Sequence, residues 1–170
     1  MIPADSLLAK VDGAMNAIAV HGDAVGPTLF YGAGAGELPT ASAVVADLME
    51  LGREVLRGSA GRVAPLSTLP EALVPKPIVP LGELYGRVYL RFTARDEPGV
   101  LSNVTGRLGR HGISIESVVQ KGRGHEGMSV PVVVFTHPAA EVAVRRALEE
   151  IDQLPAITAP TRLIRIEEEL

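Results

Sequence analysis

Two short segments of the chain carry residues whose types and spacing suit ligand chemistry. The first, residues 31–40, reads Tyr-Gly-Ala-Gly-Ala-Gly-Glu-Leu-Pro-Thr and places three alternate glycines before a helical pattern. Glycines let a ligand approach the backbone closely, and free amides at a helix start favour polar or negative groups. Short glycine runs also merely turn strands into helices, so spacing alone leaves both roles open.

The second segment, residues 95–101, reads Arg-Asp-Glu-Pro-Gly-Val-Leu and opens another helical pattern. Amides near Gly99 suit a carboxylate, while Asp96 suits an ammonium group, so the pair matches the two ends of an amino acid. A purely structural alternative is that Asp96 caps the helix, with Pro98 near its first position. The predicted effector-binding residues are Asp96, Pro98, Gly99, Val100 and Leu101, with Ile113, Ser114 and Ile115 as the facing wall.

Local patterning predicts a β-hairpin and a helix around the first segment. Two apolar strands, 14–20 and 25–31, flank a turn at 21–24 that contains a Gly-Asp pair. Apolar residues spaced by three and four predict a helix over 41–56. A short helix is expected over 4–11.

The second half of the chain has a regular βαββαβ order. Alternating residues from Tyr85 onward indicate a half-buried strand, and the helix that follows begins at Pro98-Gly99. The further elements are a strand at 113–120, a hairpin loop at 121–127, a strand at 129–136, a helix at 138–154 and a strand at 161–167. This order predicts an α+β, ferredoxin-like unit: a four-stranded antiparallel sheet with both helices on one face.

Between these halves, residues 58–84 are rich in proline, which argues against a long helix or a central strand. A flexible linker is one interpretation. Because Leu, Ile and Val also recur there, we favour an ordered strap that lies across a surface.

Composition narrows the possible functions. Of 170 residues, 46% are apolar and only 4% aromatic, so the core must be aliphatic. The net charge is −4 and the Lys and Arg residues are scattered, which argues against nucleic acid as a partner. The absence of cysteine excludes disulfides, thiolate metal sites and a cysteine nucleophile. The four histidines share no ligand spacing, so no metal is expected. No apolar run approaches the roughly 20 residues of a membrane span, and no secretory pattern is present, so we expect a cytoplasmic protein with no membrane partner.

Residues 85–167 resemble an ACT domain, the amino-acid-sensing module of many biosynthetic enzymes. The resemblance rests on the stretches 89–101 and 108–118. It implies that the loop after the first strand and the first helical turn hold an amino-acid effector, often at a dimer interface. It therefore implies a homodimer that forms through the ACT domain.

Residues 2–57 resemble the end of the catalytic region of homoserine dehydrogenase. The carriers are Ile2-Pro3, Leu8-Ala9, Val11, Gly13, Asn16-Ala17, Gly22-Asp23, Val25-Gly26, Tyr31-Gly32, Gly34-Ala35-Gly36, Pro39 to Val44 and Asp47. Such enzymes reduce aspartate semialdehyde to homoserine with NAD(P), on the route to threonine and methionine. The resemblance implies that the nicotinamide end of the cofactor lies against Tyr31, Gly32, Gly34, Ala35, Gly36 and Thr40.

The combined resemblance predicts three parts: a catalytic remnant at 1–57, a strap at 58–84 and an ACT regulatory domain at 85–170. We expect a C-terminal regulatory fragment that senses an amino acid, with threonine favoured because the resemblance implies end-product feedback. The sequence contains no strand–GxGxxG–helix unit and no lysine that matches the catalytic one, so catalysis and cofactor binding by this chain alone are not expected. The alternatives are a free-standing amino-acid sensor and the ACT tail of another biosynthetic enzyme.

Overall fold

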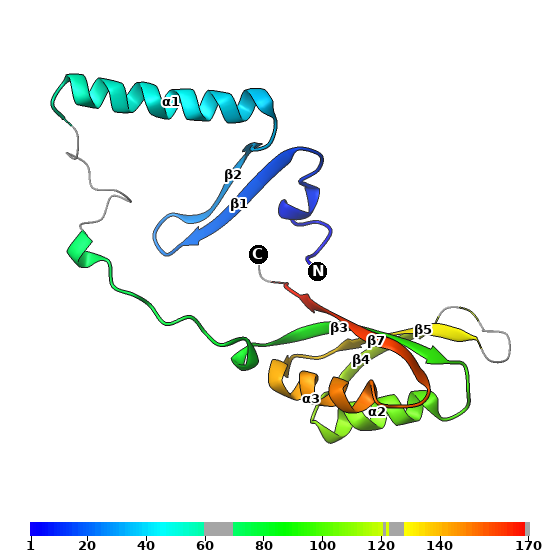
Figure 1. The fold of residues 1–170 in the computed structure, drawn as a ribbon. Helices are drawn as coiled ribbons and strands as arrows, with labels where there is room; N and C mark the ends of the chain where they lie inside the picture. The colour runs from blue at the N-terminus through cyan, green and yellow to red at the C-terminus, as the bar shows by residue number, and fades with distance from the viewer. Residues whose placement is uncertain (60–69, 121, 123–127, 169–170) are drawn as a thin grey trace. The chain divides into compact units, whose positions relative to one another are not determined.

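The computed structural model describes residues 1–59, 70–120, 122 and 128–168. The chain forms two compact units: Ala4–Pro77, and Ile78–Leu170 together with Met1–Pro3 (Figure 1). The predicted hairpin loop at 121–127 lies outside the described residues, apart from Gly122. In the part of the chain that is described, no helix is long and apolar enough to cross a membrane.

The Ala4–Pro77 unit contains the predicted hairpin and helix. Strands β1 (Met15–Gly22) and β2 (Gly26–Ala33) pair antiparallel from Met15 opposite Ala33 to Gly22 opposite Gly26. Helix α1 spans Glu37–Leu56 and so begins four residues before the predicted start. The predicted helix over 4–11 is wrong in extent, because only a single 3-10 turn forms, at Leu8–Lys10.

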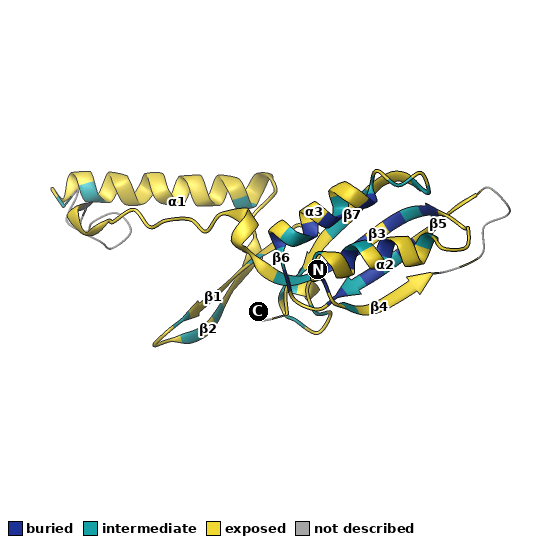
Figure 2. Cartoon of the chain, turned by 90° about the horizontal axis from the view of Figure 1, so that it is seen from below, coloured by how far each residue is buried: buried dark blue, intermediate teal, exposed yellow. Residues whose placement is uncertain are grey.

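This unit has no buried core of its own. Among its described side chains none is buried, and every residue of α1 except the partly buried Pro39 and Glu54 is exposed (Figure 2). The exposed apolar side chains include Ile18, Val20, Leu29 and Phe30 on the hairpin and Val44, Leu48, Leu51 and Val55 on α1. Because a two-stranded hairpin is marginally stable in water, the unit needs a further surface to cover these residues.

The second unit has the predicted ferredoxin-like topology. Its elements are β3 (Tyr85–Arg95), α2 (Val100–Arg110), β4 (Ile115–Gln120), β5 (Ser129–Thr136), β6 (Ala139–Ala140), α3 (Glu141–Ile151) and β7 (Ile157–Ile166). The long strands lie in the order β4–β5–β3–β7, and every pair is antiparallel. The α+β prediction is therefore confirmed.

Several boundaries differ from the prediction. Helix α2 begins at Val100 rather than at Pro98-Gly99, and strand β4 begins at Ile115 rather than at residue 113. Strand β6 is additional and pairs with the first two residues of β3, so α3 starts at Glu141 rather than at residue 138. Helix α3 also ends earlier, at Ile151. Strand β7 starts at Ile157, four residues before the predicted position.

The core lies between the sheet and the two helices, which cover one face (Figures 1 and 2). Alternate residues of β3 point into it, as the sequence pattern predicts, and Leu90 and Phe92 are fully buried. The helices contribute residues at three- and four-residue spacings: Val104 and Leu108 from α2, and Val144, Ala147 and Ile151 from α3. Each large side chain buried here stabilises the fold by about 1.5–3 kcal/mol.

The described part of the proline-rich segment does not pack as predicted. It contains 3-10 turns at Pro70–Ala72 and Leu81–Glu83. The side chains from Glu71 to Leu84 are all exposed, and Ile78 is 92% exposed. For these residues, the predicted burial of apolar side chains against a surface is not observed. Residues 60–69 lie outside the described residues.

Candidate effector site and cofactor loop

The predicted cofactor loop joins β2 to α1. Tyr31 and Gly32 lie near the end of β2, just before its last residue, Ala33. Gly34 and Ala35 form the connection, and Gly36 immediately precedes the helix. Thr40 lies in the first turn, where its backbone N–H donates to the Gly36 carbonyl oxygen at 3.1 Å. All six predicted residues are exposed and follow one another around one helix start. Thus the structure places them together.

The three glycines of this loop differ in what the chain itself requires of them. Gly36 has a φ of 117°, which side-chain-bearing residues rarely adopt. A Cβ atom at Gly34 would lie 2.7 Å from Nδ2 of Asn16. At Gly32 the backbone is ordinary, and no described atom lies within 4 Å of an added Cβ. Packing and backbone strain therefore explain Gly34 and Gly36 but not Gly32.

The predicted effector segment borders a small cavity in the second unit, Ile78–Leu170 with Met1–Pro3. We call it the ACT unit, after the resemblance of residues 85–167 to ACT domains. Asp96, Val100 and Leu101 line it, as do Arg95, Glu97 and Gln120 beside the core residues Phe92, Ala94, Val104, Val130 and Val132. The cavity holds about 40 Å³. Ligand pockets usually reach about 300–1,000 Å³. An amino acid here would therefore need a second surface to enclose it.

The start of α2 shapes this cavity. Gly99 has a φ of 87°, in the left-handed region that glycine favours, and the helix begins at the next residue. The first-turn amides of a helix have no acceptor within the helix. The Val100 N–H donates to the Glu97 carbonyl oxygen at 3.3 Å, and the positive end of the helix dipole lies at this turn. Val100 and Leu101 supply part of this turn and part of the cavity wall.

The capping alternative for Asp96 is wrong. The residue that precedes the helix is Gly99, which has no side chain to accept a hydrogen bond from the first-turn amides, so Asp96 is not the N-cap residue. Instead, the Asp96 carboxylate accepts a hydrogen bond from Nε2 of Gln120, at the end of β4, at 3.2 Å. Pro98 lies two residues before the first helical residue rather than at it.

Ile113, Ser114 and Ile115 are not placed beside Asp96 within one chain. Strand β4 begins at Ile115, opposite Thr136, whereas its far end, Gln120, reaches the cavity. Ile113 is only 3% exposed and Ile115 packs against the core. Ile113 and Ile115 thus belong to the interior, whereas Ser114 is exposed. Gln120 occupies the wall position that these three residues were expected to hold.

Gln120, Arg95 and Glu97 are polar lining residues that were not predicted from the sequence. Arg95 and Glu97 adjoin Asp96 in sequence, so the same loop argument includes them. Gln120 lies 24 residues away, and only the antiparallel register of β4 brings it to the loop. No local sequence signal identifies it.

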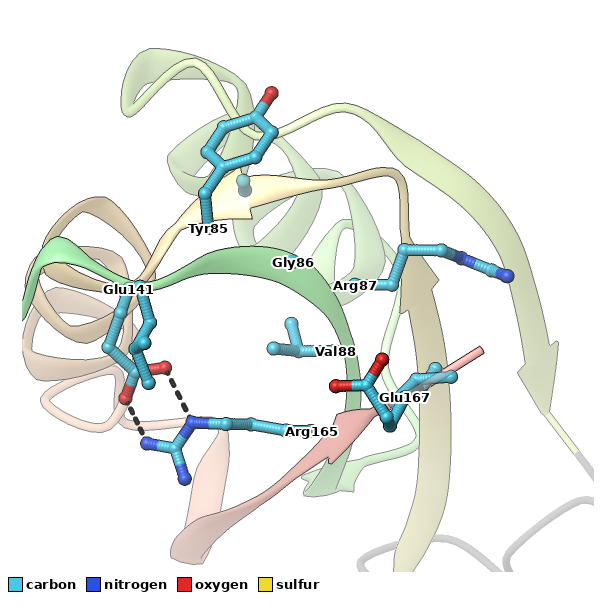
Figure 3. Close-up of a pocket in the computed structure, with 10 residues that line it drawn as sticks. Tyr85, Gly86, Arg87, Val88, Glu141, Arg165 and Glu167 are labelled. Carbon is cyan, nitrogen blue, oxygen red and sulfur yellow. Dashed lines mark hydrogen bonds and ion pairs between the residues drawn. The ribbon is translucent and has the colours of Figure 1, made fainter. Parts of the chain in front are cut away.

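A second cavity, of about 120 Å³, lies at the opposite end of the sheet (Figure 3). Its most distinctive residue is Glu141, whose side chain is 3% exposed. The Glu141 carboxylate accepts hydrogen bonds from Nε and Nη2 of Arg165, at 3.1 and 2.6 Å. Nη2 of Arg145 lies 2.8 Å from the same carboxylate. This buried charge is fully paired and holds the start of α3 to the end of β7.

One carboxyl group has a shifted pKa. A hydrogen bond from His111, at 2.8 Å, lowers the pKa of Glu150 below its ordinary value, and the charges of His111 and Arg110 act in the same direction. These side chains join the end of α2 to α3 on the surface. Across the described residues, no group of three or more His, Asp or Glu side chains is arranged to hold a metal ion.

The comparison with known families first defines the class of protein. Residues 88–156 match the ACT domain family, in agreement with the observed topology. This part of the chain is therefore similar to ACT domains. The rest of the comparison identifies the relatives: residues 1–49 match the homoserine dehydrogenase family, and the whole chain corresponds to the C-terminal part of these proteins.

The relatives match along nearly the whole chain. Homoserine dehydrogenase of Pseudomonas aeruginosa is 43% identical over 168 residues, which are 99% of this chain and 39% of the relative. The Neisseria gonorrhoeae protein of the same name is 42% identical over 98% of this chain and 38% of its own length. The crystal structure of a homoserine dehydrogenase from Thiobacillus denitrificans is 44% identical, with a TM-score of 0.80, over 98% of this chain and 37% of that one. Hence this chain spans somewhat over a third of the length of the relatives that it matches.

Proposed function

We propose that this chain supplies the regulatory ACT domain and one edge of the catalytic unit of a homoserine dehydrogenase, and that the ACT domain senses an amino acid. Threonine is the favoured effector, because it is an end product of the pathway that such an enzyme would feed. Effector binding would inhibit the dehydrogenase through a change in association or domain arrangement.

The observation that carries this proposal is the cavity at the start of α2. It combines a carboxylate, Asp96, with the donor-rich end of a helix, and these match the ammonium and carboxylate groups of one amino acid. The apolar wall made by Val100, Leu101 and Val104 leaves room only for a small side chain. Threonine, with its short branched side chain, meets both requirements.

A second copy of the chain would complete the site. The cavity is too small to enclose an amino acid by itself, and Gln120 lies at the end of β4, which is an edge strand in the described sheet. Unpaired edges offer N–H and C=O groups to another strand. We therefore propose a homodimer formed through the ACT domain, with the effector near the interface.

The glycine loop fits the nicotinamide end of NAD(P). Gly32 lacks an explanation in the packing of this chain, and a flat ring against its backbone would require the absence of a side chain there. Tyr31, Gly34, Ala35, Gly36 and Thr40 would complete that wall. When bound, the cofactor would supply the hydride; the loop would orient it and exclude water.

The hairpin and α1 also argue for a larger catalytic unit. Their apolar side chains are exposed, and the matched relatives are more than twice as long as this chain. We propose that the remaining part of a homoserine dehydrogenase covers these surfaces. The purified 170-residue chain, mixed with NADPH and aspartate semialdehyde, should therefore show no turnover; measurable turnover would refute this part of the proposal.

Calorimetric titration with threonine tests the sensor role, with other amino acids of the aspartate pathway as comparisons. Asp96→Asn keeps the shape and the contact with Gln120 but removes the charge that faces the ammonium group. Hydrogen bonds to charged groups contribute about 1.5–3 kcal/mol, so affinity should fall by roughly 10- to 150-fold. Glu149→Gln, on the exposed side of α3, is the matched control and should leave the affinity unchanged. Absence of heat with every amino acid would overturn the sensor role.

One observation favours a second candidate, a free-standing amino-acid sensor. The ACT unit has its own buried core, whereas the other unit has no buried residue among those described. Co-expression with the upstream part of a related homoserine dehydrogenase separates the candidates. A stable complex with threonine-sensitive activity supports the enzyme; threonine binding without complex formation supports the sensor.

A further inference from the structure

The first three residues belong to the ACT unit, although they precede the hairpin unit in sequence. The N-terminal amino group of Met1 donates to the carbonyl oxygen of Arg165, and the Glu167 N–H donates to the Met1 carbonyl oxygen at 2.8 Å. This pattern is that of a parallel bridge, with Met1 opposite Ile166. Two peptide connections therefore join the units, one after Pro3 and one after Pro77.

The end of β7 that carries this bridge is firmly fixed. Arg165 is held by two hydrogen bonds to the buried carboxylate of Glu141, as Figure 3 shows. The backbone N–H of Glu141 in turn donates to the carbonyl oxygen of Leu84 at 2.8 Å, just before β3. Removing one partner of a buried ion pair is costly, so this end of β7 stays attached to α3 and β3.

The other end of β7 lies beside the candidate effector cavity. Ile157 pairs with Ala94, and the Arg95 N–H donates to the carbonyl oxygen of Ala156 at 2.8 Å. Both Ala94 and Arg95 line the cavity. The pairing between β3 and β7 shifts register on either side of Thr93, so the ladder is irregular there and regular toward Ile166.

Strand β7 therefore spans the whole ACT unit, from the effector cavity to the segment that enters the hairpin unit. Its ten residues extend over roughly 33 Å at about 3.3 Å per residue. We propose that β7 transmits occupancy of the effector cavity to Met1–Pro3, and through the Pro3–Ala4 peptide bond to the hairpin segment. This inference rests on the proposed sensor function and names its route.

The transmission requires that the effector prefer one arrangement of the strand. A ligand that contacts the loop at Arg95 and Asp96 pulls on the irregular end of the β3–β7 ladder. Because hydrogen bonds hold β7 along β3 and the Glu141 pair fixes its far end, a change of twist is passed on to the Met1 bridge. In the proline-rich connection the side chains from Glu71 to Leu84 are exposed, and its backbone hydrogen bond to Glu141 lies at Leu84, seven residues after Pro77.

Two substitutions at one position test this route. Glu167→Pro removes the N–H that donates to Met1, while Ile166 already has the extended backbone that a following proline requires. Glu167→Ala removes only the side chain and is the matched control. Amide exchange, measured by NMR with and without saturating threonine, reports the response at residues 9–11, whose N–H groups close the 3-10 turn after Pro3.

In the unaltered chain and in Glu167→Ala, threonine should change exchange at residues 9–11 by about fivefold or more, the lower limit of common allosteric coupling. In Glu167→Pro the change should fall below twofold at saturation. Exchange at Phe92, in the ACT core, should be alike in all three proteins and so verifies folding.

Calorimetric titration of the same three proteins with threonine distinguishes failure of the proposed route from failure of the proposed sensor function. Threonine binding with no response at residues 9–11 would overturn the route alone, as would a full response in Glu167→Pro. Absence of binding would remove the sensor function and the route together. Binding with a response that only Glu167→Pro abolishes supports both.

Discussion

Glu141 has a buried carboxylate, and we expect even a conservative substitution there to lower the free energy of unfolding substantially. Its two oxygens accept from Arg165 at 3.1 and 2.6 Å, and Arg145 approaches at 2.8 Å. Glu141→Gln keeps one acceptor oxygen but turns an amide N–H₂ group toward a guanidinium. The substitution therefore replaces a charge-assisted pair with an unfavourable donor–donor contact.

The expected loss follows from the exposure of the partners. Removing one member of a buried pair costs about 3–5 kcal/mol when the other charge remains buried. Here the Arg165 and Arg145 side chains are 44% and 52% exposed, so both can regain water. The value should therefore be nearer that of a hydrogen bond to a charged group, about 2 kcal/mol. This corresponds to a roughly 30-fold shift in the unfolding equilibrium.

Urea unfolding should be followed by near-UV circular dichroism, to which the edge-to-face contact of Tyr89 with Phe135 (centroids 5.5 Å apart) contributes within the ACT unit. Amide exchange along β3 gives an independent free energy for the same unit. Glu149→Gln, an exposed glutamate on the same helix, is the control and should change stability by less than about 0.5 kcal/mol. The reasoning is refuted if Glu141→Gln and its control have the same midpoint.

Three further changes address other parts of the ACT unit. Leu108→Ala removes a fully buried side chain and should lower the free energy of unfolding by about 2–5 kcal/mol in the same urea assay; a loss below 1 kcal/mol would contradict the packing described. Gly99→Ala meets no steric obstacle but forces alanine to a φ of 87°, at about 1–2 kcal/mol, so calorimetry should show weaker threonine binding as the helix start shifts; unchanged affinity would separate this turn from the site. His111→Ala removes the hydrogen bond to Glu150, so the pKa of that carboxyl should rise toward its ordinary value in a ¹³C NMR titration, and an unchanged pKa would contradict the assignment.

The lowered pKa of Glu150 makes the stability of the fold depend on pH. The pKa in the folded state is depressed, so the carboxylate stabilises the fold at pH values above the ordinary pKa of glutamate. This contribution is lost as the pH falls through the lowered pKa. In His111→Ala most of this depression is removed, so the part of the acid-induced loss of stability that comes from Glu150 should be smaller. Urea midpoints at a series of pH values between 3 and 6 measure the difference directly.

Much of the ACT fold was predictable because the spacing of apolar residues in the sequence matches the period of each strand or helix. Strand β5 was predicted with its exact bounds, because Val130, Val132 and Val134 alternate with outward residues and all three are buried. Strand β3 follows the same rule. The helices were found from apolar residues that recur every three or four positions, and those residues form the core.

The errors arose where tertiary pairing overrides local signals. The last strand was predicted only from residue 161, yet β7 begins at Ile157 and passes through Pro160. Proline is tolerated there because β7 is an edge strand and Pro160 lies near the register shift at Thr93. The two-residue strand at Ala139–Ala140 forms only because Tyr85 and Gly86 lie alongside. No local sequence pattern predicts a strand of only two residues.

The candidate effector site was predicted in part. The loop residue Asp96 and the helix residues Val100 and Leu101 line the cavity, because sequence neighbours stay neighbours in space. The facing wall depends on where a strand begins and ends relative to its partners. The register of β4 depends on its pairing within the whole sheet and cannot be read from local sequence. Ile113, at the start of the predicted strand, was therefore predicted in the wall, whereas Gln120, at its end, lines the cavity.

The parallel bridge between Met1 and Ile166 has a consequence for exchange of this domain between genes. A fusion that transplanted only residues 78–170 onto another enzyme would leave the amide of Glu167 without its acceptor and shorten the sheet at that edge. A functional fusion must also include a segment that replaces Met1–Pro3, although in this chain that segment is separated from residue 78 by the whole Ala4–Pro77 unit. The inheritable module is thus discontinuous in sequence, which limits how freely such a regulator can be shuffled.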